Sequence, residues 1–249
     1  MEAGLPMLNI AVVTPYYKEP AEQLLQCHNS VLKQTYPCTH LLVADGFPRE
    51  VSTPKRTLHV QLPKGNADYG NTPRMIGGLL ADSYGFDAVA YLDADNWYAR
   101  EHLAKLVEAQ QSTGAPLVSC KRTFCDIEGR VLPVTEPEED KFQHVDTNCW
   151  LIMRPAFPLF YRWRIPKPAA VIGDRVFFQN AQRERYQITE THHRTVFYRT
   201  KYPDHYKRAN VPMPEGAYET DEVLKAYAYL MTLPGAIEMT SMVGFFPKF

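Results

Sequence analysis

The sequence predicts an α/β fold in which helices flank one mixed β-sheet, within a single domain over residues 1–249. Two features of the first half of the chain predict it. Continuous apolar runs of strand length occur at 8–14, 41–44 and 88–92, and segments with apolar residues at near-helical spacing separate them. A strand, a helix and a second buried strand in succession form a βαβ unit, whose two strands are parallel.

The elements of the first half follow from where these apolar patterns start and stop. Tyr36-Pro37 ends the first helix, because proline lacks a backbone donor and clashes with the preceding turn. Asp45-Gly46 ends the second strand with residues that favour a turn. The expected order is strand 8–14, helix 21–34, strand 41–44, strand 58–62, helix 72–83, strand 88–92 and helix 100–111.

Beyond Pro116 the pattern changes to strand-like segments around one helix. The expected order is strand 117–125, strand 146–153, helix 174–182, strand 195–200 and a closing helix at 219–230. The chain therefore divides into two halves, about 8–114 and about 115–249, which we expect to share one sheet.

Charge and cysteine content limit the partners and the location. Lysine plus arginine number 27 against 28 aspartate plus glutamate, so the chain lacks the basic excess typical of nucleic-acid binding. The five cysteines are an odd number without a Cys-x-x-Cys pair, which predicts reduced thiols. The apolar run at 8–13 is too short for a signal or membrane helix. We expect a cytoplasmic protein without a transmembrane segment, either free or peripheral at the inner face of the membrane.

The loop after the first strand argues against two common nucleotide-binding folds. A dinucleotide-binding domain needs Gly-x-Gly-x-x-Gly there, and the sequence has Thr14-Pro15-Tyr16-Tyr17-Lys18-Glu19. Gly-x-x-x-x-Gly-Lys-Ser/Thr does not occur in the sequence either, which excludes a P-loop. Any phosphate must therefore be bound by another device.

Asp93-Ala94-Asp95 directly follows the apolar strand at 88–92. Residues two apart point to the same side of a strand, so both carboxylates are expected at the carboxyl edge of the sheet, where α/β folds bind ligands. Two carboxylates together with a diphosphate suit a divalent cation, Mg²⁺ or Mn²⁺. The alternative is a turn in which Asp95-Asn96 caps the following helix.

Four motifs in order resemble a known family. They are VTPYYKE at 13–19, NSVLKQTYP at 29–37, VADG at 43–46 and YLDADN at 91–96. This series is similar to that of the GT-A glycosyltransferases of family 2, strongly over about the first hundred residues and more thinly over 146–206. The resemblance implies a GT-A fold in which residues 8–114 bind a nucleotide sugar and residues 115–249 bind the acceptor and close the domain.

In that family the loop after the first strand and the acidic residue ending the second strand hold the nucleoside, usually uridine. The matching residues are Thr14, Tyr16 and Asp45. A carboxylate accepts hydrogen bonds from uracil N3–H or ribose hydroxyls, and an aromatic ring stacks on a base. The alternatives are that Tyr16 covers the core and that Asp45-Gly46 is only a turn.

A basic residue that the family has near the donor matches Arg74, in the run Gly70-Asn71-Thr72-Pro73-Arg74. Its planar guanidinium can pair with a diphosphate. An arginine in the first turn of a helix is unfavourable for the helix dipole, which favours an external anion as its partner. The alternative is a solvated arginine.

Inverting members of the family use an acidic residue at the start of a helix in the acceptor half as general base. Asp174 is the match, although Gly173-Asp174 stands where the family more often has Glu-Asp. A carboxylate there would take the proton of the acceptor hydroxyl as it attacks the anomeric carbon. The alternative is an N-cap aspartate.

Histidine supplies the predicted third metal ligand. His205 is the first choice beside Asp93 and Asp95, with His192 and His193 as alternatives. Trp150 is expected either to stack on the donor sugar or to belong to the core. The acidic run Glu138-Glu139-Asp140 is expected to be a solvated surface.

The resemblance implies an enzyme that moves a sugar from a nucleotide sugar, a UDP-sugar, to a hydroxyl of a saccharide or lipid-linked saccharide, as in polysaccharide biosynthesis. Inversion and dependence on Mn²⁺ or Mg²⁺ are implied in the same way, with Asp93 serving both donor and metal. One alternative is a nucleotidyltransferase acting on a sugar phosphate, although its usual Gly-rich basic loop is absent after the first strand. The other is a non-catalytic nucleotide-sugar-binding protein.

Overall fold

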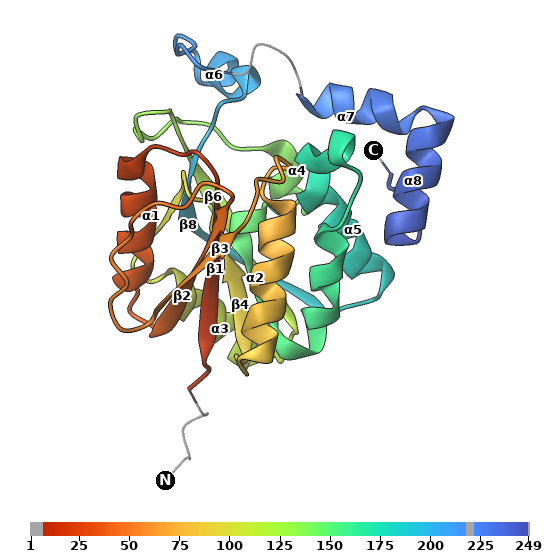
Figure 1. The fold of residues 1–249 in the computed structure, drawn as a ribbon. Coiled ribbons are helices and arrows are strands. Elements are labelled where there is room, and N and C mark those ends of the chain that lie inside the picture. The colour runs from red at the N-terminus through yellow and green to blue at the C-terminus, as the bar shows by residue number, and fades with distance from the viewer. Residues whose placement is uncertain (1–6, 218–221, 249) are drawn as a thin grey trace.

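An eight-stranded mixed sheet runs through the computed structural model, which describes residues 7–217 and 222–248 (Figure 1). Its strand order is β3-β2-β1-β4-β7-β6-β8-β5. The strands are β1 Ile10–Tyr16, β2 Cys38–Asp45, β3 Thr57–Leu62, β4 Ala88–Tyr91, β5 Trp97–Tyr98, β6 Leu117–Cys125, β7 Trp150–Met153 and β8 Ile188–Arg199. Strands β1 to β4 pair in parallel, and β7 is antiparallel to both β4 and β6. The predicted α/β fold with a mixed sheet is confirmed.

Helices cover both faces of this sheet. The helices are α1 Ala21–Leu32, α2 Asn71–Ser83, α3 His102–Thr113, α4 Pro137–Asp140, α5 Gly173–Arg183, α6 Pro203–Ala209, α7 Glu222–Leu230 and α8 Leu233–Val243. Thr14 of β1 faces α1, where its hydroxyl lies 3.7 Å from the Cys27 sulfur. The neighbouring Val13 faces α2, where its side chain packs directly on Gly77. Because every residue of β1 is buried, the strand is apolar on both faces, as a central parallel strand requires.

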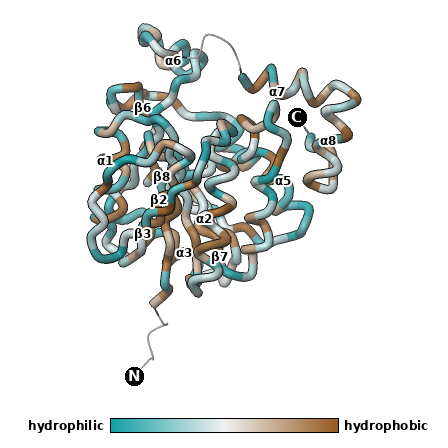
Figure 2. Tube along the Cα trace, in the orientation of Figure 1, coloured by the Kyte–Doolittle hydropathy of each residue, from teal (hydrophilic) through white to brown (hydrophobic). Residues whose placement is uncertain are grey.

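The hydrophobic core follows this layering. In Figure 2, brown, hydrophobic segments of the chain gather in the interior of the molecule, whereas the loops around the outside are mainly teal. A second, smaller core joins α7 and α8 to α5 and the segment before it, through Ala226, Leu230 and Met239 packed with Ile172 and Val176. Residues 222–230 of the predicted closing helix are confirmed as α7, and its first three positions lie outside the described residues.

The second half of the chain differs most from the predicted elements. β7 begins only at Trp150, because Asp146 accepts a hydrogen bond from the Asn148 backbone and starts a 3₁₀ turn at Thr147–Cys149. The segments Arg154–Trp163 and Lys167–Ile172 are also 3₁₀ helices, since proline residues within them cannot donate the bonds of an α-helix.

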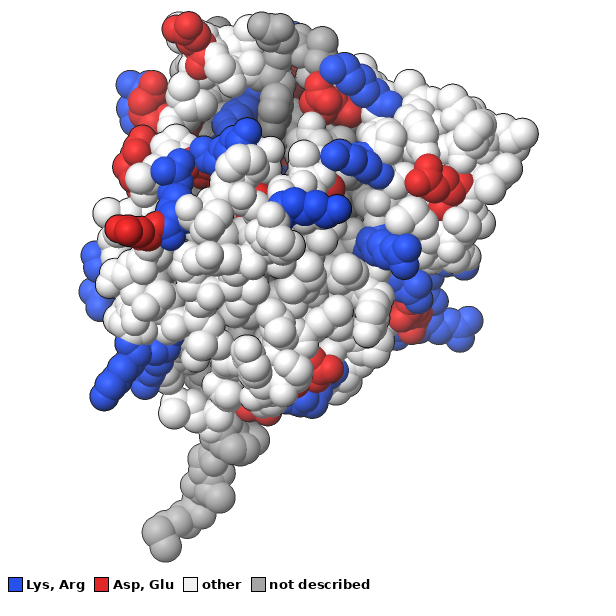
Figure 3. All heavy atoms as spheres, viewed as in Figure 1, with Lys and Arg blue, Asp and Glu red and all other residues white. Residues whose placement is uncertain are grey.

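Charges on the surface are of both signs. In the face seen in Figure 3, Lys and Arg are interspersed with Asp and Glu, and a large part of the surface carries neither. This distribution agrees with the net charge of −1 and gives no basic stripe on that face. Within residues 7–217 and 222–248, none of the helices is long and apolar enough to cross a membrane.

The strand order creates a place for a ligand. From β1 the chain proceeds through β2 to β3 on one side, and returns to pair β4 on the other side of β1. In α/β sheets the crevice at such a switch point, beyond the carboxyl ends of the strands, is where ligands bind. Tyr16 ends β1, Asp45 ends β2, and Asp93 lies two residues after β4. The fold therefore brings three of the predicted site residues to one edge.

Candidate active site

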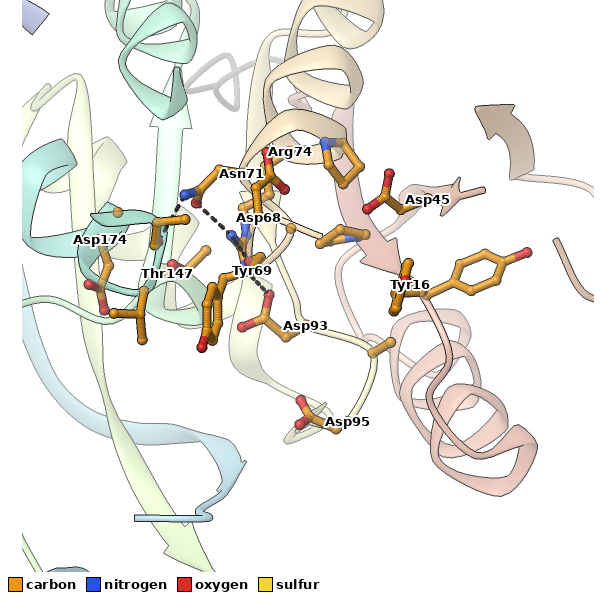
Figure 4. Close-up of a pocket in the computed structure, with 18 of the residues that line it drawn as sticks. Tyr16, Asp45, Asp68, Tyr69, Asn71, Arg74, Asp93, Asp95, Thr147 and Asp174 are labelled. Atoms are coloured by element: carbon orange, nitrogen blue, oxygen red, sulfur yellow. Dashed lines mark hydrogen bonds and ion pairs between the residues drawn. The ribbon is translucent and has the colours of Figure 1, made fainter. Parts of the chain in front are cut away.

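A cleft of about 300 Å³ opens at this edge of the sheet. The residues that line it include the four predicted carboxylates, which come from three separate stretches of the sequence: Asp45, Asp93 with Asp95, and Asp174. In Figure 4, Asp93 lies between Asp45 on one side and Asp174 on the other. The volume is at the lower end of the range of about 300–1,000 Å³ usual for small-molecule sites. The fold thus assembles the predicted acidic residues around one space.

Asp93 is fixed in place from two sides. Its Oδ1 accepts a hydrogen bond from Arg74 Nη2 at 2.5 Å, and its Oδ2 accepts one from Asn148 Nδ2 at 3.1 Å. Asn148 Oδ1 also accepts the backbone N–H of Asp93 at 2.5 Å. The Asp93 side chain keeps 25% of its surface exposed towards the cleft. The carboxylate is therefore oriented before any ligand arrives.

Arg74 is buried, so the solvated alternative for it is wrong. Its guanidinium is 7% exposed and donates hydrogen bonds to the Tyr69 carbonyl and the Asn71 side chain as well as to Asp93 (Figure 4). It also lies over the ring of Trp163, with 5.3 Å between the guanidinium carbon and the ring centroid. Arg74 lines the cleft, and its direct partner in the structure is Asp93 rather than an external anion.

Asp95 carries the charge that is least compensated. Burial and the negative charge of Asp93 raise the pKa of Asp95 to about 6, although Lys201 opposes them at 3.9 Å. Arg199 holds the backbone here, donating hydrogen bonds from its side chain to the Asp95 carbonyl and from its N–H to Asn96 Oδ1. Asn96 therefore binds the backbone of β8. The cap of the following helix, α3, is Glu101, so the alternative in which Asp95-Asn96 caps that helix is wrong.

The residues present fit a divalent cation that has the diphosphate as its partner. Asp93 and Asp95 line the same open space, the charge of Asp93 raises the pKa of Asp95, and hard oxygen ligands of this kind suit Mg²⁺ or Mn²⁺. Within the described part of the chain, no group of three or more His, Cys, Asp or Glu side chains is placed to hold a metal. Asp93 and Asp95 would therefore be the protein's contribution, and the remaining ligands would come from phosphate and water.

His205 does not join them, which corrects the prediction of a third metal ligand. Its ring is buried behind β8, with Nδ1 2.6 Å from the Thr200 hydroxyl and Nε2 3.6 Å from Glu136. The alternatives His192 and His193 are exposed on the surface of β8. His205 does follow β8, but it lies in α6, where its ring contacts Thr200 and Glu136 and does not line the cleft.

Thr14 also lies elsewhere. Its side chain is fully buried on the α1 face of β1, where the hydroxyl is 2.8 Å from His40 Nε2. The next two residues of the strand, Pro15 and Tyr16, line the cleft. The predicted contact of Thr14 with a nucleoside is therefore wrong for the side chain, because α1 covers that face of the strand.

Asp45 and Tyr16 form the far wall of the cleft. Both carboxylate oxygens of Asp45 accept hydrogen bonds from Asn66, which holds the loop after β3 against the cleft. Gly46 makes this approach feasible, since its φ is +81° and a Cβ there would lie 2.1 Å from the Gly65 nitrogen. The Tyr16 hydroxyl is 2.7 Å from His59 Nε2, while the ring packs with Leu42 and other apolar residues. Tyr16 therefore covers the core and lines the cleft at once.

Asp174 lies at the opposite wall, in the first turn of α5. The helix cap is Ile172, and no side chain makes the cap hydrogen bond, so the alternative of an N-cap aspartate is wrong. Asp174 Oδ1 instead accepts the Arg175 backbone N–H at 2.7 Å, and Oδ2 is 2.7 Å from His144 Nε2. Burial disfavours the charge, but His144 outweighs it and holds the pKa of Asp174 below its usual value.

Within the acidic run before this site, the prediction of a solvated surface is wrong for Glu139, which is only 3% exposed. Glu139 pairs with Arg122 of β6 and with Arg194 of β8, and Glu138 pairs with Arg175 at 2.5 Å. Arg122 is also buried and donates to Asp146 at 2.8 Å. These pairs build a charged layer beneath Asp174. Trp150 is fully buried against Phe177 and Phe178, which establishes the core alternative for it.

A second cavity of about 820 Å³ adjoins the cleft. The two spaces share Asp146, Val171, Asp174, Tyr198 and Tyr202 in their walls. Beyond these shared residues the second cavity extends over the layer of ion pairs and α6. Asp174 is thus reachable from both sides, as a group acting between two substrates has to be.

Three residues around the cleft were missed by reasoning from sequence: Asn148, His144 and Lys201. Asn148 and His144 act through residues more than 25 positions away, at separations of 55 and 30. Lys201 lines the cleft beside Asp95, immediately after β8. The only available signal was their location next to segments already assigned to the site.

The order of the strands and the acidic cleft at the carboxyl ends of β1, β2 and β4 define a GT-A fold. Solved structures of TarS from S. aureus have this fold. TarS 1-349 in complex with UDP matches at 15% identity and a TM-score of 0.58, over 91% of this chain and 73% of that one. The complex with UDP-GlcNAc matches at 15% identity and a TM-score of 0.59, over 88% and 69%.

A longer TarS structure matches at 14% identity and a TM-score of 0.59, over 88% of this chain and 41% of its own length. At such identities the likeness is one of fold. No protein-family model matches the sequence, and no curated protein matches it.

Proposed function

We propose that this chain is a glycosyltransferase that moves a sugar from a UDP-sugar to an acceptor hydroxyl. One observation carries the proposal: Asp45, Asp93, Asp95 and Asp174 converge on one cleft at the switch point of a GT-A sheet. The same fold in TarS was solved in complex with UDP and with UDP-GlcNAc. The resemblance to family 2 glycosyltransferases in four ordered motifs supports the same conclusion.

The donor is proposed to lie along the cleft from Asp45 towards Asp174. Asp45 and the ring of Tyr16 would receive the uridine, and Asp93 and Asp95 the diphosphate with a divalent cation. Such a cation neutralises charge that develops on a departing diphosphate. Lys201 and Arg74 add positive charge along the same wall, which favours an anionic ligand there.

The acceptor, a hydroxyl of a saccharide or lipid-linked saccharide, is proposed to enter through the second cavity. Asp174 takes the proton of this hydroxyl while the hydroxyl oxygen bonds to the anomeric carbon. The bond from that carbon to the diphosphate oxygen breaks, and UDP leaves with the electron pair. Because the hydroxyl attacks the face opposite the departing UDP, the anomeric centre is inverted. A positioned base of this kind contributes about 10²–10⁴-fold to the rate.

A thermal-shift panel tests the donor. UDP, UDP-GlcNAc and other UDP-sugars are added with Mn²⁺ or with EDTA, and NAD and ATP serve as comparison ligands. We expect uridine nucleotides to raise the melting temperature when Mn²⁺ is present, because a ligand at 100 times its Kd stabilises the native state by about 2.7 kcal/mol. No shift with any uridine nucleotide, alongside a clear shift with NAD or ATP, would contradict the proposal.

Variants in the cleft sharpen this test. Asp93→Asn and Asp95→Asn should each weaken Mn²⁺-dependent binding of UDP while the protein stays folded, because both side chains reach the cleft. Asp82→Asn is the matched control, since Asp82 is half-exposed in α2 and pairs with the surface residue Arg154. UDP affinity that is equal in all three variants would mean that the cleft carboxylates do not bind the donor.

A further inference from the structure

We propose that His144 is a positioning residue for the general base, holding the Asp174 carboxylate ionised and in a fixed orientation where the two cavities meet. The inference rests on the proposed function of Asp174. It concerns a histidine that none of the sequence motifs includes and that lies 30 positions before the residue it contacts.

The geometry leaves Asp174 little freedom. Its two oxygens are held by different elements: Oδ1 by the Arg175 backbone N–H of α5, and Oδ2 by the His144 ring. Each distance is 2.7 Å. Rotation of the carboxylate would break one or both contacts. The anchored carboxylate lines both cavities, at the junction where the acceptor hydroxyl is expected.

His144 itself is not placed to act as the base. Its Nε2 faces Asp174, and its Nδ1 faces Glu136 Oε2 at 3.5 Å. Both ring nitrogens therefore point at carboxylates, and the side chain is only 6% exposed. His144 also lines the second cavity, but with both nitrogens directed at carboxylates it acts on Asp174 rather than as the base itself.

The surroundings of the ring favour its charged form. Two carboxylates, Asp174 and Glu136, face the ring, and the positive charge of Arg122 opposes them. Arg122 is itself engaged with Glu136, Glu139 and Asp146. Although burial lowers it, the two carboxylates raise the pKa of His144 to about 9. At neutral pH the pair is therefore His144⁺ and Asp174⁻.

This charge has a chemical use. A carboxylate must be ionised before it can take a proton, and burial alone would raise the pKa of Asp174 and leave it protonated over more of the pH range. The positive ring removes that penalty. The charges of Arg175 and Arg122 act on Asp174 in the same direction but with smaller effects, and Arg175 Nη1 pairs with Glu138 at 2.5 Å.

The first test reads the pair directly and does not depend on turnover. Side-chain ¹⁵N NMR of the full chain follows each histidine ring between pH 5 and 10 in the wild type and in Asp174→Asn. We expect the His144 ring to titrate at about pH 9 in the wild type and at a clearly lower pH in the variant. A ring that titrates near the ordinary value of 6.5, or that ignores Asp174→Asn, would overturn the proposal.

The second test reads the base. Release of UDP from UDP-GlcNAc is measured between pH 5 and 9 for the wild type, His144→Gln and the control His193→Gln, whose histidine is exposed on β8. Gln can still donate a hydrogen bond but carries no charge. We expect the acid limb of the pH–rate profile of His144→Gln to move to higher pH. The ratio of its rates at pH 8 and pH 5 should rise on the order of tenfold, and its affinity for UDP should be unchanged.

An unshifted profile for His144→Gln would overturn the positioning role. If neither wild type nor variants turn over any UDP-sugar, the proposed function fails while the NMR titration still decides whether the ion pair exists. A loss of UDP binding in both His144→Gln and His144→Phe would mean that the residue only supports the fold, and would overturn the positioning role.

Discussion

Arg74 and Asn148 orient Asp93 before a ligand binds, and their own burial makes that arrangement costly to break. Arg74 is 7% exposed and donates to three different oxygen atoms. A buried charge that loses its partner is destabilising because the other charge stays behind without compensation. Arg74 and Asn148 therefore contribute to the stability of the fold as well as to the geometry of the cleft.

Replacing Arg74 by methionine should cost up to about 3–5 kcal/mol of unfolding free energy, because the largely buried Asp93 carboxylate would lose its cationic partner and keep only its hydrogen bonds with Asn148. Urea denaturation measures it. The control is Lys105→Met, which removes an exposed pair with Glu108 and should cost about 0–1 kcal/mol. Equal losses in the two variants would show that the Arg74 contact is no stronger than a surface ion pair.

His144 also makes stability depend on pH. Its pKa is raised from 6.5 to about 9 in the folded chain, so its stabilisation is complete below pH 6.5 and is lost as the pH rises through 9. The unfolding free energy should fall over that window by at most about 1.4 kcal/mol per pH unit for this one proton. Urea unfolding at several pH values should show this fall in the wild type and a smaller one in His144→Gln. Parallel curves would contradict the account.

Among the elements, α2 approaches the sheet most closely at Gly77. A Cβ added there would lie 2.4 Å from Cγ1 of Val13 and 3.2 Å from Val43. The small residue lets the helix sit down on β1 and β2, which sets where Arg74 enters the cleft one turn earlier. Packing of this helix and the geometry of the site are therefore linked.

Gly77→Ala tests this link. Helix propensity alone predicts a gain of about 1 kcal/mol, whereas the clash with Val13 predicts a loss of about 1–3 kcal/mol. We expect the loss, measured as a lower urea midpoint. Ser83→Ala, at the exposed end of the same helix, should change stability little. A stabilised Gly77→Ala would mean that the helix can shift without cost.

Sequence patterns identified the elements well where strands are buried and helices amphipathic. The strand now seen as β4 is apolar throughout, and α2 begins within one residue of its expected start. The patterns failed over 154–172, because prolines replace α-helix by 3₁₀ helices that have no clear apolar period. β8 was predicted too short, since its first residues are polar and alternate poorly.

The same contrast holds for the site. Asp93 and Asp95 could be found because they follow a buried strand, and Asp45 and Asp174 because they match positions of the family that the sequence resembles. The direction of the Thr14 side chain could not be predicted, because it depends on which face of β1 is covered by α1. The partners that hold the carboxylates, such as Asn148 for Asp93, arise from contacts between distant segments that no local pattern encodes.

In the whole molecule, one sheet carries both halves of the chain. Strands β1 to β4 come from the first half and β6 to β8 from the second, and β7 joins them through its antiparallel pairing with β4. The cleft and the second cavity therefore meet at the seam between the halves, where Asp174 lies. The division into a donor half and an acceptor half is the prediction that this seam supports.

The measurement that tests the account most directly is made on Asp174→Asn. The affinity for UDP with Mn²⁺ and the rate of UDP release from the best-binding UDP-sugar are compared with those of the wild type. We predict an unchanged affinity and a rate lower by about 10²–10⁴-fold, because the variant keeps the shape of the side chain but cannot take a proton. A rate close to that of the wild type, with UDP still bound, would contradict Asp174 as the base of a sugar transfer.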